Sequence, residues 1–440
     1  MEKFSRKNWL LLLLFGTVGQ IAWSVENMFF NLFVFEKVAP NLDAITLMVQ
    51  LSGVAATLTT LFAGVFSDKI GNRRAFISWG YAIWGVTVAL FGCLSPDLVG
   101  SIFGLPIAEA IPLCLTLVVA ADCIMTVFGS TANDAAFNAW VTDNTRPSYR
   151  GTVEGILSIL PLIAMLIVAG GFGIIKDLVG YRNLFIGLGA VISLSGVLGI
   201  FLMRDADTLE RNGGFRDIFY GFKPSVVKSH GTLYLTLLAV LIYGVACQIF
   251  MPYLIIFMTT YLGFEVIEYS IVFGGAIILG AVVNFFLTRL SDRMDKVNLM
   301  YSAAGTMAAG LLFMYLSSFV SGKTPLLILF GISGFVMIVG YIFVSALCGS
   351  VVRDHTPVGA VGKMQGVRMV ASVLIPMLAG PAIGNAINKV RGEMLPNLDS
   401  ADVMTTEYIP APEIFLVGAL MTLLIFAVVP FLSKLTKKKV

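Results

Sequence analysis

Residues 131–155, TANDAAFNAWVTDNTRPSYRGTVEG, leave one apolar run of the chain and enter the next. The second half of this stretch recurs at residues 352–366, VRDHTPVGAVGKMQG. The matching positions are Asp143, Thr145, Gly151 and Gly155 with Asp354, Thr356, Gly362 and Gly366, and Glu154 with Gln365. Because the two copies are separated by roughly half of the 440 residues, they indicate two related halves.

The composition indicates a membrane protein. The chain is 58% hydrophobic and 12% charged, with a mean hydropathy of +0.90, whereas soluble domains carry about 25% charged residues. The apolar residues form long blocks, and a helix needs about 20 of them to cross a bilayer. Helices satisfy their backbone groups within that bilayer, so we predict an all-α integral membrane fold.

Twelve membrane spans are predicted, in two groups of six that form pseudo-symmetric six-helix bundles. The spans are roughly 9–35, 44–66, 75–94, 110–141, 152–175, 183–203, 231–261, 266–288, 299–319, 325–351, 362–388 and 413–433. The first bundle occupies residues 1–203, a polar cytoplasmic linker 204–230, and the second bundle 231–440. The run from residue 9 to 35 shows no convincing cleavage site, so we interpret it as a span and not a signal peptide.

The distribution of basic residues predicts that both termini are cytoplasmic. With that orientation, the outer segments contain only Lys37, Lys176, Arg182, Lys323, Lys389 and Arg391 of the 29 Lys and Arg residues. We therefore expect a multi-pass protein of the plasma (cytoplasmic) membrane, embedded in the lipid bilayer. Trp79, Trp84 and Trp140 are interpreted as anchors at the membrane–water interfaces.

The loop between spans 2 and 3 carries a recognisable motif. It reads Gly64-Val-Phe-Ser-Asp68-Lys-Ile-Gly71-Asn-Arg73-Arg74, and a shorter version, Ser291-Asp292-Arg293, lies between spans 8 and 9. Both resemble the cytoplasmic loops of the major facilitator superfamily. The resemblance covers the whole chain and implies a transporter with two six-helix bundles around a central cavity.

A second resemblance concerns the branch of that superfamily. NDAAFNAWVTDNT followed by RGTVEG is similar to the glycoside–pentoside–hexuronide:cation symporters, the group around melibiose permease. That resemblance implies uptake of a sugar or glycoside coupled to a cation. Span 2, however, reads LMVQLSGVAATLTTLFAGVF and lacks the acids that hold sodium in the branch. H⁺ and Na⁺ therefore both remain open as coupling ions.

Polar residues inside the spans are costly in lipid and should face a cavity. The candidate substrate residues are Trp23, Glu26, Asn27 and Asn31 in span 1, Asn133, Asp134 and Asn138 in span 4, and Gln248 and Asn284 in the second half. Acids and amides suit hydroxyl groups, while aromatic rings suit the apolar face of a sugar. Glu26 and Asp134 are also the candidate coupling residues. The alternative for each is a structural hydrogen bond between spans.

Asp122 also lies in span 4 but is not among the predicted substrate or coupling residues. It precedes Asp134 by about three helical turns, or roughly 18 Å at 1.5 Å per residue. We therefore place it near the outer end of span 4, as an interface residue, with a role in the site as the alternative.

Charged residues at the cytoplasmic ends are predicted to form a gate that closes the inner side. They are Asp68, Arg73, Arg74, Asp143, Arg146, Arg150, Glu154, Asp292, Arg293, Asp354, Gln365 and Arg368. The motif acid can face a helix N-terminus, and the arginines can bond carbonyls or acids. The alternative is ordinary topology-setting charge.

The sequence favours a transporter over other membrane proteins. It contains no nucleotide-binding loop, metal cluster or catalytic triad, so we predict no enzymatic activity, no metal and no cofactor beyond the coupling ion. The expected partners are a small-molecule substrate and the bilayer, not nucleic acid, and the expected state is a monomer. Export of drugs, movement of lysolipids or other solutes, and a transport-like receptor remain alternatives.

Overall fold

The computed structural model describes residues 5–145, 150–206, 214–291, 294–356, 364–394 and 408–437. In this part of the chain nearly every segment is helical, and one antiparallel bridge pairs Met394 with Tyr408. The residues divide into two compact units, one of Met1–Phe215 and one of Arg216–Leu398 with Thr406–Val440. The boundary lies within the segment 204–230.

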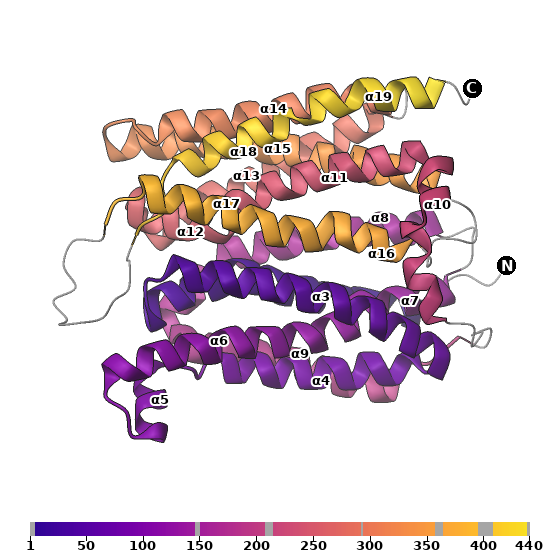
Figure 1. Cartoon of the computed structure of the whole chain (residues 1–440). Helices are drawn as coiled ribbons and strands as arrows, with labels where there is room; N and C mark the ends of the chain where they lie inside the picture. Colours follow the sequence, from indigo (N-terminus) through magenta and orange to yellow (C-terminus); the bar gives the residue numbers. More distant parts are fainter. Residues whose placement is uncertain are drawn as a thin grey trace. The chain divides into compact units, whose positions relative to one another are not determined.

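The first unit contains the helices of the N-terminal half (Figure 1). They are α1 (Arg6–Val25), η1 (Glu26–Phe30), α2 (Asn31–Phe33), η2 (Val34–Val38), α3 (Leu42–Ile70), α4 (Arg73–Phe91), α5 (Pro96–Phe103), α6 (Ile107–Gly129), η3 (Ser130–Phe137), α7 (Asn138–Asn144), α8 (Arg150–Ile167), η5 (Val168–Phe172) and α9 (Gly173–Leu202). Helix α4 packs against both α6 and α9.

The second unit repeats this all-helical construction. Its elements are η6 (Phe215–Phe222), α10 (Pro224–Ser229), α11 (Gly231–Phe250), η7 (Met251–Tyr253), α12 (Leu254–Ile256), η8 (Phe257–Tyr261), α13 (Val266–Ser291), α14 (Lys296–Ser317), α15 (Lys323–His355), α16 (Gln365–Met369), η9 (Val370–Leu374), α17 (Ile375–Arg391), α18 (Glu413–Leu423) and α19 (Ile425–Lys437). Helix α14 packs against α15, α18 and α19.

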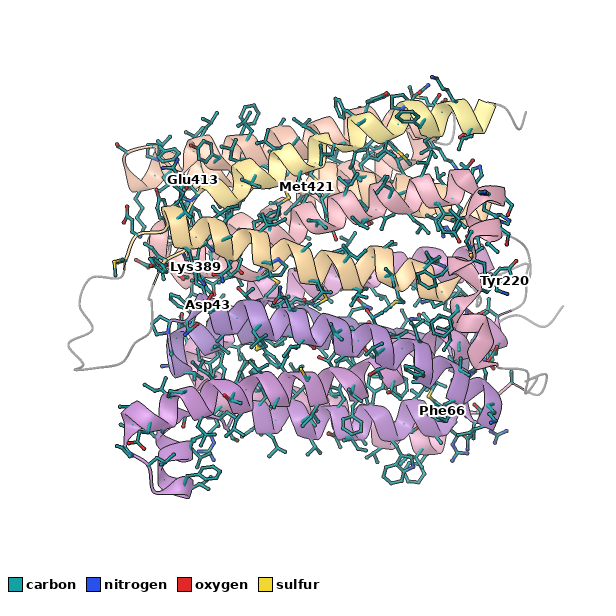
Figure 2. All side chains as sticks on the ribbon, in the orientation of Figure 1. Asp43, Phe66, Tyr220, Lys389, Glu413 and Met421 are labelled. Carbon is teal, nitrogen blue, oxygen red and sulfur yellow. The ribbon has the colours of Figure 1, made fainter. Side chains whose placement is uncertain are left out.

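Helix α3 shows how the sequence sets the ends of a span. The side chain of Asn41 accepts a hydrogen bond from Ala44 N at 2.9 Å and caps the first turn. The helix ends at Gly71, whose φ of 68° is left-handed, and Asn72 then caps α4. Figure 2 shows Asp43 and Phe66 near the opposite ends of α3. The motif between spans 2 and 3 is therefore a tight turn.

Eleven helices in the described residues are long and apolar enough to cross a membrane, and one of them, Ile159–Leu202, contains two spans. Its first part runs in the same direction as the first span. Gly16 lies against Leu160, and further along both helices Phe29 lies 6.1 Å from Phe172 between ring centroids.

The chain reverses at Gly180, where φ is 79° and ψ is 162°. Beyond it the chain runs back along the first span. Phe185 packs edge-on against Phe30, and the later Gly199 lies beside Phe15. Glycine makes the reversal possible because other residues rarely adopt this backbone conformation. Counting the two parts separately confirms the predicted twelve-helix fold.

Aromatic residues close the core at one end of the first unit. The rings of Phe30 and Phe91 stack at 4.0 Å, and Phe185 meets both edge-on. Such pairs contribute about 0.5–1.5 kcal/mol each beyond the area that they bury. Phe33 and Tyr181 extend the same group. The first span is thereby fixed to α4 and to the segment after Gly180.

Two of the three tryptophans assigned to membrane interfaces lie in the core instead. Only Trp79 is exposed, at 61%. Trp84 is fully buried against Trp23 and Tyr81, and Trp140 stacks on Phe137 and donates from Nε1 to the carbonyl of Arg204 at 2.8 Å. The prediction was wrong for Trp84 and Trp140 because residue type alone does not say which face of a helix a side chain occupies.

The predicted linker contains structure of its own. Helix η6 packs against the start of the eleventh span, where Ile218 lies beside Gly366. Tyr234 donates a hydrogen bond to the carbonyl of Gly221, and the nearby Tyr220 is labelled in Figure 2. This part of the linker therefore belongs to the packing of the second unit.

Candidate functional site

Three buried or half-buried acids of the first unit come from two spans. Glu26 begins the π-helical segment η1, Asp122 lies on α6, and Asp134 lies in the π-helical segment η3. Asp122 and Asp134 are both close enough to Glu26 to interact with it electrostatically. π-Helical turns often occur at functional sites because they turn side chains away from the regular helical direction.

Glu26 is 8% exposed. Its Oε1 lies 3.1 Å from the hydroxyl of Thr126, and that hydroxyl is also 2.8 Å from the backbone carbonyl of Asp122. The other carboxyl oxygen, Oε2, is buried and has no hydrogen-bond partner among the described residues. The acid predicted in span 1 is thus inside the protein, not on its lipid face.

Asp122 is 1% exposed and lies one helical turn before Thr126. Ser52 of α3 is within hydrogen-bonding reach of its carboxyl group, whereas Oδ1 has no partner in the described part of the chain. The structure brings Asp122 close to Glu26 and Ser52, which a predicted position near the outer end of span 4 does not indicate. The signal was present, because Asp122, Thr126 and Ser130 recur every four residues on one helical face.

Asp134 is held by its own helix. Ser130 donates to Oδ2 at 3.1 Å, and the amide of Asn133 donates to Oδ1 at 3.0 Å. The hydroxyl of Tyr81 lies 2.7 Å from the carbonyl oxygen of Phe15 and 2.9 Å from the amide oxygen of Asn133, so its one hydrogen is shared between these two acceptors. The carboxylate is therefore oriented through a chain of hydrogen bonds that connects α1, α4 and η3.

Two indole rings lie beside this network. The rings of Trp23 and Trp84 are 5.0 Å apart between centroids, with an interplanar angle of 47°. Gly129 leaves room for them, since a Cβ atom there would lie 2.8 Å from Trp84 and 3.0 Å from Trp23. The Nε1 of Trp23 is buried and lies within hydrogen-bonding reach of the Asp134 carboxyl group, at a geometry too long or too bent for a regular hydrogen bond.

The remaining predicted amides of the first unit support the helices. Asn27 donates to the carbonyl of Trp23 at 2.8 Å, Asn31 to that of Asn27 at 3.1 Å, and Asn138 to that of Asp134 at 3.1 Å. Asn31 is buried, whereas Asn27 and Asn138 are exposed. The exposed amides keep their oxygen atoms accessible to a ligand.

The two predicted substrate residues of the second unit have different surroundings. Asn284 is buried and donates to the carbonyls of Gly280 and Val339, so it connects α13 to α15. Gln248 is half-buried on α11 and packs against Gly380 of α17. Asn284 thus acts as a structural connection, which was the alternative considered for such residues.

The second unit also contains a pair of tyrosines that were not predicted as site residues. The rings of Tyr243 and Tyr341 meet at 6.2 Å between centroids, and Tyr243 OH lies 3.5 Å from the hydroxyl of Ser345. All three are half-buried. In an apolar span such tyrosines look like packing residues, so the sequence carries no signal that separates them.

The predicted gate residues of the first unit form an ion-pair network within that unit. Arg73 is buried; its guanidinium contacts Asp68 and Ser67, and its Nε lies 3.1 Å from Asp143. Arg74 donates from Nη2 to the carbonyl of Ile200. Asp205 accepts from the backbone N of Arg74 at 2.8 Å. The motif loop is thereby bound to the ends of the fourth and sixth spans.

The second unit contains the corresponding pair. Lys296 Nζ lies 3.1 Å from Asp354 and 2.7 Å from the hydroxyl of Ser350. Gln365 and Arg368 are half-buried at the start of α16. Asp292, Arg293, Arg146 and the side chains of Arg150 and Glu154 lie outside the described residues. A gate formed by these residues remains a prediction.

The acids have no arrangement typical of a metal centre. In the residues that the structure describes, no group of three or more His, Cys, Asp and Glu side chains could hold a metal ion. What the arrangement offers is hydrogen bonding, aromatic contact and proton binding.

Comparisons with known proteins bear on the fold. The sequence profile described as Major Facilitator Superfamily matches residues 11–381, and it matches residues 236–439 a second time. A search of curated proteins finds no match.

Several solved structures have the same fold. The nucleoside transporter NupG aligns with a TM-score of 0.63 and 14% identity, covering 97% of this chain and 98% of that one. A bacterial homolog of the human lysosomal transporter Spinster, inward-facing and occupied, aligns with a TM-score of 0.69 and 13% identity over 99% of this chain and 98% of that one. A bacterial metal transporter aligns at 0.57 and 15% identity, covering 98% and 100%. At these identities the likeness shows a shared fold.

Proposed function

Because the chain belongs to the Major Facilitator Superfamily, whose members carry solutes across membranes, we propose that it moves a sugar or glycoside by alternating access. The observation that supports this substrate class is the group around Asp134. A carboxylate oriented by Ser130 and Asn133 lies within hydrogen-bonding reach of the buried indole N–H of Trp23. Carboxylate and indole N–H can bond hydroxyls, while the ring packs on a sugar face.

Nucleosides belong to the same chemical class, because they are glycosides of a base. NupG, which has the same fold, is described as a nucleoside transporter. The Trp23–Trp84 pair offers aromatic area that suits a base as well as a sugar ring. Both kinds of glycoside therefore belong among the substrates to be tested.

The proposal includes coupling to a cation, H⁺ or Na⁺. Glu26 and Asp134 are the acids that would bind it, because both lie on the spans that carry the substrate group. Protonation or cation binding would neutralise the site together with substrate binding and so allow the halves to reorient. We further propose that the protein is a monomer of the plasma membrane with both termini cytoplasmic.

Uptake of radiolabelled solutes into proteoliposomes tests this function. Sugars, glycosides, nucleosides and lysolipids are compared with imposed proton or sodium gradients, and empty liposomes serve as the control. Gradient-driven uptake of a sugar or glycoside supports the proposal. Transport of lysolipid alone, or sugar uptake that neither gradient affects, contradicts it.

A further inference from the structure

Glu26 and Asp122, here called the carboxyl pair, are buried and close enough to interact electrostatically. Both are more than nine-tenths buried, and each has one carboxyl oxygen without a hydrogen-bond partner in the described residues. An ionised carboxylate in such surroundings is strongly disfavoured. Two of them that repel each other are disfavoured further.

The described neighbours that interact with the carboxyl pair are acids, a thiol and hydroxyl groups. Helix α6 contributes Cys123, η3 contributes Asp134, and α3 contributes the hydroxyl of Ser52. From α4, Tyr81 faces Asp134 through Asn133. In the described part of the chain, the titratable groups that interact with the carboxyl pair are therefore the acid Asp134 and the thiol of Cys123.

The hydroxyl of Thr126 shows where a proton belongs. A hydroxyl has one hydrogen and two lone pairs. The carbonyl of Asp122, at 2.8 Å, can only accept, and it is the closer partner. If Thr126 donates its hydrogen there, Glu26 Oε1 at 3.1 Å faces the lone pairs of the hydroxyl. In that orientation of the hydroxyl, the contact is favourable when Glu26 itself carries a hydrogen and donates it.

We propose that Glu26 holds a bound proton on Oε1 and donates it to the hydroxyl of Thr126, and that the neighbouring Asp122 favours this protonated form. The proton comes from water, forms an O–H bond with the carboxylate and returns to water when that bond breaks. The carboxyl pair therefore selects H⁺ as the coupling ion and adds Asp122 to the coupling residues. This coupling role rests on the proposed function, whereas the bound proton does not.

Infrared spectroscopy of the purified, full-length protein in lipid tests the proton directly. At neutral pH in sodium-free buffer, the wild type is expected to show the carbonyl stretching band of a protonated carboxyl group, shifted in heavy water. Glu26→Gln should remove this band. Asp134→Asn and the solvent-facing control Asp354→Asn should leave it in place.

Thr126 provides a second test that does not remove either acid. Thr126→Val deletes the acceptor of the proton while keeping the shape of the side chain, so the band should persist at a changed frequency. Thr126→Ser retains the hydroxyl and should restore the frequency of the wild type. This pair of variants remains informative if Glu26→Gln does not fold.

Three results overturn the proposal. They are the absence of the band in the wild type, its loss in Asp134→Asn, and its displacement by added Na⁺, which would assign the carboxyl pair to sodium. A different result would contradict the proposed function alone. In that case the wild type transports no sugar or glycoside, while the band is present and is lost in Glu26→Gln.

Discussion

Lys296 and Asp354 form a 3.1 Å ion pair that repeats, in the second unit, the pair between Arg73 and Asp143 in the first. In each unit a basic residue in the first turn of one span contacts an acid near the end of the next. The equivalence of Asp143 and Asp354 was visible in the sequence repeat, and the structure adds the equivalence of their partners. Within each unit, the helix ends that carry this pair are thus joined in the same way.

The two ion pairs should differ in their contribution to stability. The side chain of Arg73 is 7% exposed, whereas those of Lys296 and Asp354 are 32% and 54% exposed. Exposed pairs contribute about 0–1 kcal/mol, and removing a partner from a buried charge costs several times more, about 3–5 kcal/mol at full burial. Asp143→Asn should therefore lower the Tm more than Asp354→Asn, measured by scanning fluorimetry in detergent. Equal shifts would contradict this interpretation.

Replacing Asp134 by Asn should weaken substrate uptake. The variant keeps the size of the side chain but loses the charge that accepts hydrogen bonds from Ser130 and Asn133. A hydrogen bond to a charged group is worth about 1.5–3 kcal/mol, which corresponds to about 10-fold or more in kcat/KM. Asn183→Ala is the matched control, since the amide of this exposed residue also bonds a carbonyl of its own helix, that of Val179, and the residue is not among the candidate substrate residues. An unchanged kcat/KM in Asp134→Asn would exclude Asp134 from the substrate site.

Gly129→Ala should disturb the tryptophan pair. The added methyl group would lie 2.8 Å from Trp84 and 3.0 Å from Trp23, so the rings must move. Such overpacking costs about 1–3 kcal/mol. Tryptophan fluorescence should change, and the Tm should fall. In the control Gly187→Ala, no atom lies within 4 Å of the new Cβ, and a gain of about 0.5–1 kcal/mol in helix propensity is expected. The prediction is wrong if the two variants behave alike.

Gly180→Ala should destabilise the protein through the backbone alone. No neighbouring atom lies within 4 Å of the position of its Cβ, but the φ of 79° with ψ of 162° is unfavourable for alanine. The expected cost is about 1–3 kcal/mol, measured as a lower Tm relative to Gly187→Ala. A Tm equal to that of the wild type would show that the chain can turn there without glycine.

Hydropathy and length sufficed to predict the membrane fold, because span length is set by the bilayer and not by fine packing. The polar residues of span 1 and span 4 could likewise be selected, since ionisable groups are rare in such segments. Depth was less predictable. Asp122 was placed near the outer end by counting along a straight helix, and this position gave no indication that it faces Glu26 and Ser52.

The sequence also did not predict which way the side chains of a span point around its helix axis. Trp84 and Trp140 have the composition of interface anchors, yet their partners on neighbouring helices bury them. Asn284 was selected as a polar residue inside a span, but its amide bonds the carbonyl of Val339 on α15. Which helices lie side by side depends on tertiary packing, and the pattern within one span does not encode it.

The reversal at Gly180 has a practical consequence for labelling the protein. The two antiparallel segments are joined directly at this residue, without a loop between them. An epitope tag inserted there would therefore interrupt both helices. The connection between α4 and α6 is longer and contains the short helix α5, Pro96–Phe103. An antibody tag or a protease site that reports sidedness is best placed in that connection.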